Sequence, residues 1–134
     1  MKTMPTIQKF MTAMPHTIGL DISVKKALDM MREFGIRHLP VQDGGKLVGI
    51  LTDRDLKLAA SFQKAEDLTA EDVMSPDPYT VDVDSPLDEV SQEMAAHKYG
   101  AAIVTQKNGK IVGIFTAVDG LRVLAEVLEK NYRN

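Results

Sequence analysis

The stretch GILTDRD at residues 49–55 returns as GIFTAVD at residues 113–119, and this repetition decides the fold. Both copies follow the pattern G-h-x-T-x-x-D, in which h is apolar. Beyond the heptapeptides, a shift of 64 residues pairs Gly45 of the first copy with Gly109 of the second, whereas nearer the start of each copy a shift of 63 residues pairs Met11 with Met74. We place the one-residue change of register near residues 98–100. The chain is therefore a tandem repeat, with domains at residues 6–64 and 69–130 and a polar linker at residues 63–68.

Length and composition limit the possible functions. The 134 residues are enough for one domain, or for two small units that share a core. A net charge of −3 gives no electrostatic footprint for nucleic acid or an anionic membrane. The absence of cysteine excludes disulfides, thiol nucleophiles and cysteine-based zinc sites. No apolar run reaches the roughly 20 residues of a membrane span. We expect a soluble, cytoplasmic protein without nucleic-acid or membrane partners.

Each repeat is predicted to fold as β-α-β-β-α. The first strands lie at residues 17–20 and 80–83, parallel to the strand after the helix. Hairpins follow at residues 36–51 and 101–115, where Gly44-Gly45 and Asn108-Gly109 tolerate the positive φ of a tight turn. Short helices are expected at residues 6–11 and 69–74, and a last helix from about residue 117. The predicted class is α/β (α+β), a mixed sheet with helices on one side.

Several residues predict local details of this fold. Ser23 and Ser85 are N-cap candidates, with Pro86 at the first helical position. The strands at residues 47–51 and 111–115 are apolar at nearly every position, which indicates burial on both faces. Pro40 lies within a predicted strand, and this favours an edge strand or one that faces a ligand cleft.

The sequence contains no recognisable catalytic or metal-binding motif. His16, His38 and His97 share no spacing, and none belongs to a metal-binding pair such as HExxH. No serine lies in a nucleophile elbow, and no glycine-rich phosphate loop is present. We therefore predict a protein that is not an enzyme, with no catalytic residue and no metal site.

The two heptapeptides are the strongest functional signal, and they allow two interpretations. Thr52 and Thr116 are N-cap candidates, and Asp55 and Asp119 follow three residues later, as in a capping box. Alternatively, a carboxylate held at a helix N-terminus can accept hydrogen bonds from the two hydroxyls of a ribose. The preceding glycine would let a ligand approach the backbone closely. The two roles are compatible, because a carboxylate has two oxygens.

These motifs make the chain resemble a tandem pair of cystathionine β-synthase (CBS) domains, also called a Bateman module. The resemblance rests on the two heptapeptides, on GIRHLPV at residues 35–41, and on FMT and VMSP at residues 10–12 and 73–76. It implies two pseudo-symmetric β-α-β-β-α motifs packed through their sheets, with two clefts between them. It also implies a homodimer.

The resemblance further implies an adenosine-containing ligand: AMP, ADP, ATP, S-adenosylmethionine or NAD, bound as a regulator and not as a required cofactor. Asp55, Asp119, Thr52 and Thr116 would contact the ribose. Phosphate would be bound by Arg37, His38 and Arg54, although an arginine at a strand edge is also a common surface group. The base would lie against the backbone of Thr17, Ile18, Thr80 and Val81, with Pro40 nearby.

The two copies differ where phosphate would bind. We align Arg37 and His38 with Ala101 and Ala102, and Arg54 with Val118, so we expect one good nucleotide site and one weak or apolar site. The function predicted from the sequence is a stand-alone regulatory module that binds an adenosine ligand and signals to an unknown effector protein in trans. The alternative is a ligand-independent, dimeric scaffold module.

Overall fold

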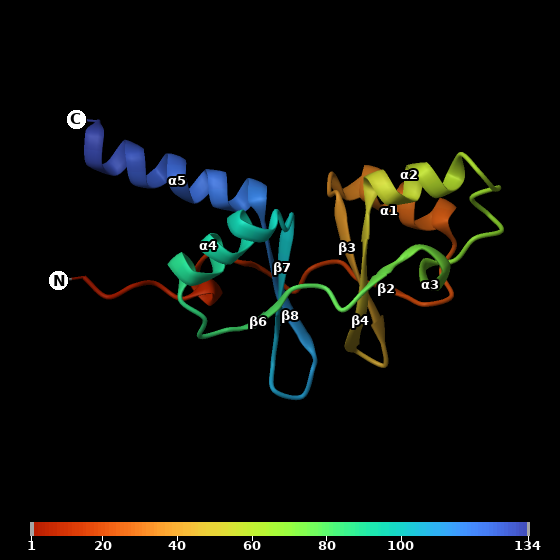
Figure 1. The fold of residues 1–134 in the computed structure, drawn as a ribbon, viewed down its shortest axis with the longest axis horizontal. Helices are drawn as coiled ribbons and strands as arrows, with labels where there is room; N and C mark the ends of the chain where they lie inside the picture. The colour runs from red at the N-terminus through yellow and green to blue at the C-terminus, as the bar shows by residue number, and fades with distance from the viewer. Residues whose placement is uncertain (1, 134) are drawn as a thin grey trace. The chain divides into compact units, whose positions relative to one another are not determined.

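The computed structural model describes residues 2–133 and divides them into two compact units. Unit 2 is His16–Pro78, whereas unit 1 combines the N-terminal segment up to Pro15 with the chain from Tyr79 onward. The compact units therefore cut across the sequence repeats. Each unit holds one four-stranded mixed sheet, with its helices on one face of that sheet (Figure 1).

Unit 2 has the strand order β2-β3-β4-β5, in which β2 is parallel to β3 and the other neighbours are antiparallel. Its elements are β2 (Ile18–Gly19), α1 (Val24–Phe34), β3 (His38–Asp43), β4 (Lys46–Thr52), α2 (Asp53–Ala60), α3 (Ala70–Val73) and β5 (Ser75–Pro76). The predicted β-α-β-β-α succession is confirmed. The core between the sheet and the helices is built on residues such as Val24, Ala27, Leu39 and Leu56, all fully buried.

Unit 1 repeats this plan with the strand order β1-β8-β7-β6. Its elements are η1 (Ile7–Lys9), β1 (Thr12–Ala13), β6 (Thr80–Asp82), α4 (Leu87–His97), β7 (Ala101–Thr105), β8 (Ile111–Thr116) and α5 (Ala117–Tyr132). As predicted, β6 is parallel to β7, and β7 and β8 form an antiparallel hairpin. The fourth strands, β1 and β5, were not expected, because two-residue strands leave no periodicity to detect.

The opening segments, residues 6–15 and 69–78, each belong to the unit formed mainly by the other repeat. β1 pairs with β8, and β5 pairs with β4. Ile7 of η1 is fully buried in the core of unit 1. The carbonyl of Pro5 accepts the N–H of Leu87 at 2.9 Å, and the carbonyl of Leu68 accepts that of Val24 at 2.8 Å. The backbone just before each opening segment thus satisfies the first N–H of a helix in that unit.

The predicted helix caps differ in outcome. Ser23 is the N-cap of α1, and its hydroxyl accepts the N–H of Lys26 at 3.1 Å, as expected. The prediction for Ser85 is wrong, because Pro86 is the N-cap of α4 and no side chain caps the helix. The Ser85 carbonyl accepts the N–H of Ile7 at 2.8 Å. Pairing with the opening segment therefore holds this region extended and moves the helix start one residue on.

The change of register between the repeats lies in the hairpin turn and not near residues 98–100. The left-handed C-caps of α1 and α4 are Gly35 and Lys98, an offset of 63. Leu51 pairs with Leu39, and Phe115 pairs with Ala102, so the offset of 63 persists along β3 and β7. The extra residue therefore lies within residues 106–109. As a consequence, Arg37 matches Gly100 and His38 matches Ala101.

Pro40 does not mark an edge strand, because β3 lies between β2 and β4. β2 is only two residues long and begins opposite Val41, so no strand residue faces Pro40 on that side. At the matching position of unit 1, the N–H of Ile103 donates to the Tyr79 carbonyl at 2.9 Å. Because proline has no backbone N–H, Pro40 lacks the equivalent of this one hydrogen bond, just before β2 begins.

β4 and β8 were both predicted to be buried on both faces. The prediction is confirmed for β8 and wrong for β4. In β8, the consecutive residues Gly113, Ile114 and Phe115 are all buried. In β4, only Gly49 and Leu51 are buried, and the residues between and before them are partly exposed. An uninterrupted apolar run therefore does not by itself decide that both faces of a strand are covered.

Candidate functional site

The candidate site of each unit lies where the last long strand turns into a helix. Thr52 ends β4 and caps α2, and its hydroxyl accepts the N–H of Asp55 at 3.2 Å. Thr116 ends β8 and caps α5, and its hydroxyl accepts the N–H of Asp119 at 3.2 Å. The capping interpretation of both threonines is confirmed.

The two aspartates of the motif are in different states. Asp119 is buried and completes a capping box, because its Oδ2 accepts the N–H of Thr116 at 2.9 Å and the Thr116 hydroxyl at 3.1 Å. Its Oδ1 accepts from Arg122 at 3.0 Å. The Asp55 carboxylate is partly buried and has no hydrogen-bond partner within residues 2–133. Asp55 is thus the carboxylate with both oxygens available for a ligand.

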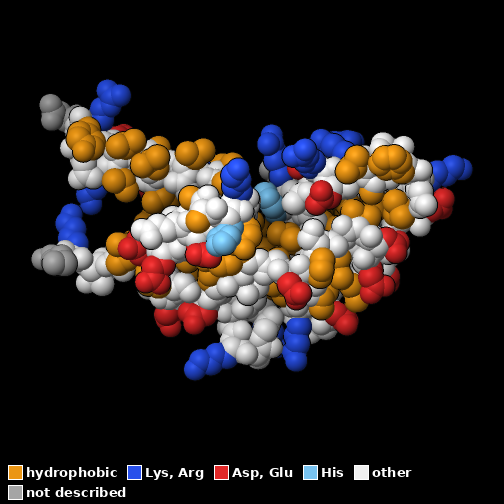
Figure 2. All heavy atoms as spheres, viewed as in Figure 1, with side chains coloured by type: hydrophobic (Ala, Val, Ile, Leu, Met, Phe, Trp, Pro, Cys, Tyr) orange, Lys and Arg blue, Asp and Glu red, His pale blue; other side chains and the backbone are white. Residues whose placement is uncertain are grey.

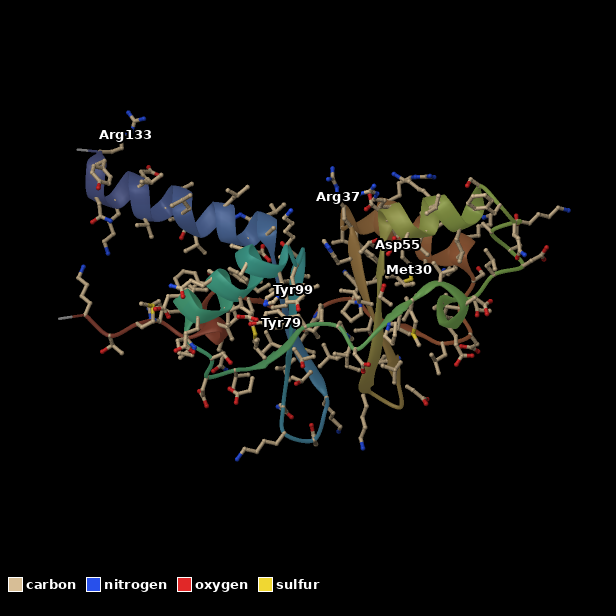
Figure 3. The ribbon with its side chains drawn as sticks, in the orientation of Figure 1. Met30, Arg37, Asp55, Tyr79, Tyr99 and Arg133 are labelled. Atoms are coloured by element: carbon tan, nitrogen blue, oxygen red, sulfur yellow. The ribbon has the colours of Figure 1, made fainter. Side chains whose placement is uncertain are left out.

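The predicted phosphate ligands gather at the same end of the unit 2 sheet. The carbonyl of Arg37, just before β3, accepts the N–H of Asp53 at 3.1 Å, so this residue lies beside the start of α2. The side chains of Arg37 and Arg54 are exposed. Figure 2 shows Lys and Arg side chains grouped over the start of α2, and Figure 3 shows Arg37 and Asp55 at this end of the sheet. The structure therefore places Asp55 and two exposed arginine residues at the same end of the unit 2 sheet.

His38 opens β3 at this end and is half-buried. Burial lowers its pKa below 6.5, and the positive charge of Arg37 lowers it further, whereas Asp53 acts in the opposite direction. The imidazole is accordingly neutral near pH 7. It can exchange hydrogen bonds with a phosphate, but it does not bring a full positive charge.

The glycine that opens each heptapeptide makes room for a methionine and not for a ligand. A Cβ built on Gly49 would lie 2.5 Å from the Sδ of Met74 and 3.0 Å from the carbonyl oxygen of Ser75. A Cβ on Gly113 would lie 2.9 Å from the Cγ of Met11 and still nearer its sulfur. The expected close approach of a ligand to these glycines is therefore wrong, because the opening segments already fill that space.

The residues predicted to contact the base lie on edge strands. β2 and β6 are the outer strands of their sheets, so one side of their backbone is not paired with another strand of the same sheet. Ile18 is buried in the core of unit 2, and Thr17 and Val81 are partly buried, while Thr80 is exposed. The side chain of Pro40 is fully buried. The side chains of Ile18 and Pro40 are therefore not available to a base, and at Ile18 a base contact would have to be made by the backbone.

Stacked aromatic rings at this end of each sheet were missed by the sequence analysis. His16 stacks on Phe34 in unit 2, with ring centroids 3.7 Å apart. In unit 1, Tyr79 stacks on Tyr99 at 5.0 Å (Figure 3), and His97 stacks on Tyr99 at 5.2 Å. The offset of 63 relates His16 to Tyr79 and Phe34 to His97, which is the signal that could have revealed these pairs.

The surroundings of Tyr79 displace the pKa of its hydroxyl. Burial raises the pKa of its hydroxyl above 10.0, and the negative charges of Glu93 and Glu89 act in the same direction. Tyr79 therefore remains a neutral, protonated phenol throughout the physiological range.

Residues 2–133 include no group of three or more histidine, aspartate or glutamate side chains placed to hold a metal ion. Within the same residues, no helix combines the length and the apolar composition that a membrane crossing requires.

The repeated mixed α/β motif, with its capped strand-to-helix junctions, defines a tandem-repeat module. The model of the CBS domain family matches residues 7–61 and 70–126. The chain therefore belongs to the CBS domain family.

Known proteins of this family are similar over nearly the whole chain. A CBS domain-containing protein of Dictyostelium discoideum is 32% identical, over 92% of this chain and 93% of its own length. The structure of the CBS domain pair of protein MJ0100, in complex with 5′-methylthioadenosine and S-adenosyl-L-methionine, has a TM-score of 0.84 and 28% identity, covering 93% of this chain and 99% of that one. CBSX2 of Arabidopsis thaliana, in complex with AMP, has a TM-score of 0.79 and 27% identity, covering 91% and 97%.

Some curated relatives are much longer than this chain. The chain spans only 21% and 22% of the length of two of them. CBS pairs thus occur both in proteins of about this length and within larger proteins.

Proposed function

We propose that this chain is a regulatory module that binds an adenosine-containing ligand of the AMP, ADP or ATP class and catalyses no reaction. The observation that carries the proposal is the carboxylate of Asp55, which has no hydrogen-bond partner among residues 2–133 and belongs to the same end of the unit 2 sheet as Arg37 and Arg54. The AMP complex of CBSX2 and the 5′-methylthioadenosine and S-adenosylmethionine complexes of MJ0100 support the ligand class.

The chemistry of this end of unit 2 suits a nucleoside phosphate. Asp55 accepts hydrogen bonds from the ribose hydroxyls, and hydrogen bonds to a charged group contribute about 1.5–3 kcal/mol. Arg37 and Arg54 bind the phosphate, since a guanidinium matches phosphate oxygens in charge and geometry. His38 adds a neutral hydrogen-bonding group. The edge backbone at Thr17 and Ile18 contacts the base.

Asp119 and Thr116 offer the corresponding ribose contact in unit 1, in which the edge strand β6 carries Thr80 and Val81. A ribose there must displace Arg122 from Oδ1, and the Arg122 side chain is exposed enough to turn aside. We therefore expect the ribose contact of unit 1 to be weaker than that of unit 2.

The proposed output is an interaction with a separate effector protein in trans. The Dictyostelium relative, of similar length, supports a module that acts as its own chain. A ligand changes such an interaction only if it binds two states of the module with different affinity. NAD belongs to the same ligand class and is included in the test below.

We also propose that two copies associate through α5. This helix leaves the sheet at Thr116 and extends away from it (Figure 1). Figure 2 shows hydrophobic side chains along it, including Leu121 at 65% exposed, Leu124 at 51% and Leu128 at 47%. Charged side chains of both signs flank this row, which suits pairing with an identical helix. Sedimentation equilibrium of Leu124→Glu should give a monomer if the wild type dimerises this way, and an unchanged mass would contradict it.

The same apolar row favours the second candidate function, a ligand-independent scaffold. A thermal-shift assay with AMP, ADP, ATP, S-adenosylmethionine and NAD distinguishes a ligand-binding module from a ligand-independent scaffold. A ligand at 100 times its dissociation constant stabilises the fold by about 2.7 kcal/mol, or about 10 °C for a chain of this length. No shift with any member of the panel would support the scaffold.

Asp55→Asn is the sharpest variant for the ligand-binding proposal. It keeps the size of the side chain and removes the charge that accepts ribose hydrogen bonds, so AMP affinity in calorimetry should fall about tenfold or more. Asp43→Asn, at the far end of β3, is the matched control and should bind AMP normally. If Asp55→Asn and wild type bind AMP equally well, Asp55 does not contact the ribose.

A further inference from the structure

Met11 and Met74 occupy equivalent places in the two units. Each follows a short helix, η1 or α3, and directly precedes a two-residue strand, β1 or β5. The offset of 63 relates the two methionines. β1 pairs with β8 at Gly113, and β5 pairs with β4 at Gly49, so each methionine lies beside the glycine that opens a heptapeptide. We refer to Met11 and Met74 as the latch methionines.

The thioether of each latch methionine fills a notch that any side chain on the facing glycine would close. A Cβ on Gly49 would lie 2.5 Å from the Sδ of Met74. A Cβ on Gly113 would lie 2.9 Å from the Cγ of Met11 and nearer still to its sulfur. Both sulfur atoms therefore lie against the backbone of a long strand, with no room for a further atom on that side.

The latch methionines differ from the other methionines in their exposure. Both are only partly buried, so an oxidant in solution can reach them. Met31 and Met94 lie in the cores and are 4% and 6% exposed, whereas Met14 is 89% exposed. Because the chain has no cysteine, no thiol of its own competes with these thioethers for an oxidant.

We infer that Met11 and Met74 are oxidation sites, and that a sulfoxide at either one detaches its opening segment from the sheet. The oxidant is a peroxide. The sulfur takes one oxygen atom as the O–O bond breaks, so the thioether is oxidised to a sulfoxide and hydrogen peroxide is reduced to water. Methionine sulfoxide reductases reverse the change. This inference does not depend on the proposed ligand site.

The added oxygen does not fit where the sulfur lies. A sulfoxide oxygen is polar and only accepts hydrogen bonds. The notch at Gly49 is also bordered by the carbonyl oxygen of Ser75, 3.0 Å from the Cβ position, and a carbonyl is another acceptor. Burial of an acceptor without a donor is unfavourable, so the oxidised side chain leaves the notch. A two-residue strand that loses this contact is weakly held, because its stability comes from the sheet that it joins.

Detachment of an opening segment changes the edge of a sheet. β1 covers the outer side of β8, and β5 covers the outer side of β4. Without its partner, each long strand presents unpaired N–H and C=O groups along that side. The oxidised and reduced proteins therefore differ in the surface that these two strands present.

The test treats the full chain with graded amounts of hydrogen peroxide. Peptide mass spectrometry measures the sulfoxide at each methionine, and circular dichroism measures the midpoint of thermal unfolding. The key variant is the double substitution Met11→Leu and Met74→Leu, because leucine is close to methionine in volume and is not converted to a sulfoxide. Met14→Leu is the matched control, since it removes an exposed methionine that lies three residues from Met11.

We expect Met14 to be oxidised first without loss of stability, followed by the latch methionines, and Met31 and Met94 last. Oxidation of the latch methionines should lower the midpoint by about 4–11 °C, and a sulfoxide reductase should restore it. The double leucine variant should not show this fall at the same dose of peroxide, whereas Met14→Leu should behave as wild type does.

Hydrogen exchange distinguishes detachment of the segment from general destabilisation. The N–H of Met14 donates to the carbonyl of Val112 at 3.1 Å, so exchange within residues 12–14 should become faster on oxidation while β7 remains protected. Met11→Gln, whose amide oxygen approximates a sulfoxide, should have the same effect without peroxide, and Met14→Gln should not. This comparison retains the test if the double leucine variant does not fold.

The inference is overturned by any one of three results. The double leucine variant could lose as much thermal stability as wild type at equal oxidation, or the latch methionines could be oxidised without faster exchange at residues 12–14. They could also be oxidised no sooner than Met31 and Met94. In each case the proposed function still stands, because it is tested separately by the binding of AMP.

Discussion

Replacing Gly113 by alanine should destabilise unit 1 through a clash with Met11. The added Cβ would lie 2.9 Å from the Cγ of Met11 and nearer still to its sulfur, so the methionine side chain must move out of its place against β8. The φ of Gly113 is not in the positive range, so the backbone adds no strain. Overpacking of this kind costs about 1–3 kcal/mol.

The expected change in melting temperature follows from the length of the chain. An unfolding entropy of about 2.1 cal/mol/K per residue gives about 0.28 kcal/mol/K for 134 residues. A loss of 1–3 kcal/mol therefore lowers the midpoint by about 4–11 °C, which calorimetry or circular dichroism measures directly. Gly120→Ala is the matched control. Its Cβ would meet only Phe115 at 3.8 Å, and alanine is the better helix former inside α5, so this change should stabilise by up to about 1 kcal/mol.

A double-mutant cycle isolates the contact between Met11 and Gly113. Met11→Ala removes the atoms that the new methyl group would meet, so the double variant should be more stable than the sum of the two single effects predicts, by about 0.5–3 kcal/mol. Additivity within about 0.5 kcal/mol would refute the reasoning. The methionine would then not be what requires glycine at this position.

Three further predictions concern caps and titration. Ser23→Ala should cost about 1 kcal/mol in urea unfolding because it removes a capping hydroxyl, whereas Ser85→Ala should change stability little; equal losses would contradict the assignment of Pro86 as the cap. Asp119→Ala should destabilise by about 1–3 kcal/mol, since it breaks a capping box and an ion pair, while Asp55→Ala should cost less than about 1 kcal/mol. His38 has a lowered pKa in the folded state, so the unfolded chain takes up a proton first as the pH falls through 6.5, and folding stability decreases there. His38→Ala should flatten the dependence of the unfolding free energy between about pH 7.5 and 5.5, and parallel curves for the two proteins would disprove this role.

Much of the local structure could be predicted because it depends on residues close together in the chain. Ser23 caps α1 through a residue three positions away, and Thr52 and Thr116 cap their helices in the same way. Gly44 and Gly45 adopt the positive φ that their hairpin turn requires. Each cap and each turn depends only on residues a few positions away in the chain. Because residues 49–55 are repeated at 113–119, the same local structure could be predicted for the second repeat.

The sequence indicated the residues of the candidate site but not the hydrogen bonds that their side chains make. The pattern placed Asp55 and Asp119 at equivalent positions, yet only Asp119 is engaged by Arg122 and a capping box. The match of Arg37 with Gly100 follows from the register of β3 and β7, and sequence identities alone align Arg37 one position further on, with Ala101. The rings at Tyr79 and Tyr99 come together only because β6 lies beside β7.

The sequence by itself determined that this protein is a double copy of one β-α-β-β-α motif, since periodicity, caps and turns are local properties that survive in any arrangement of the copies. The tertiary structure decided which segments complete which sheet. β1 and β5 are too short to be recognised, and they bring Met11 onto Gly113 and Met74 onto Gly49 from more than 20 residues away in the chain. Only long-range packing can select such partners, because the free energy of a two-residue strand comes from the sheet that it joins.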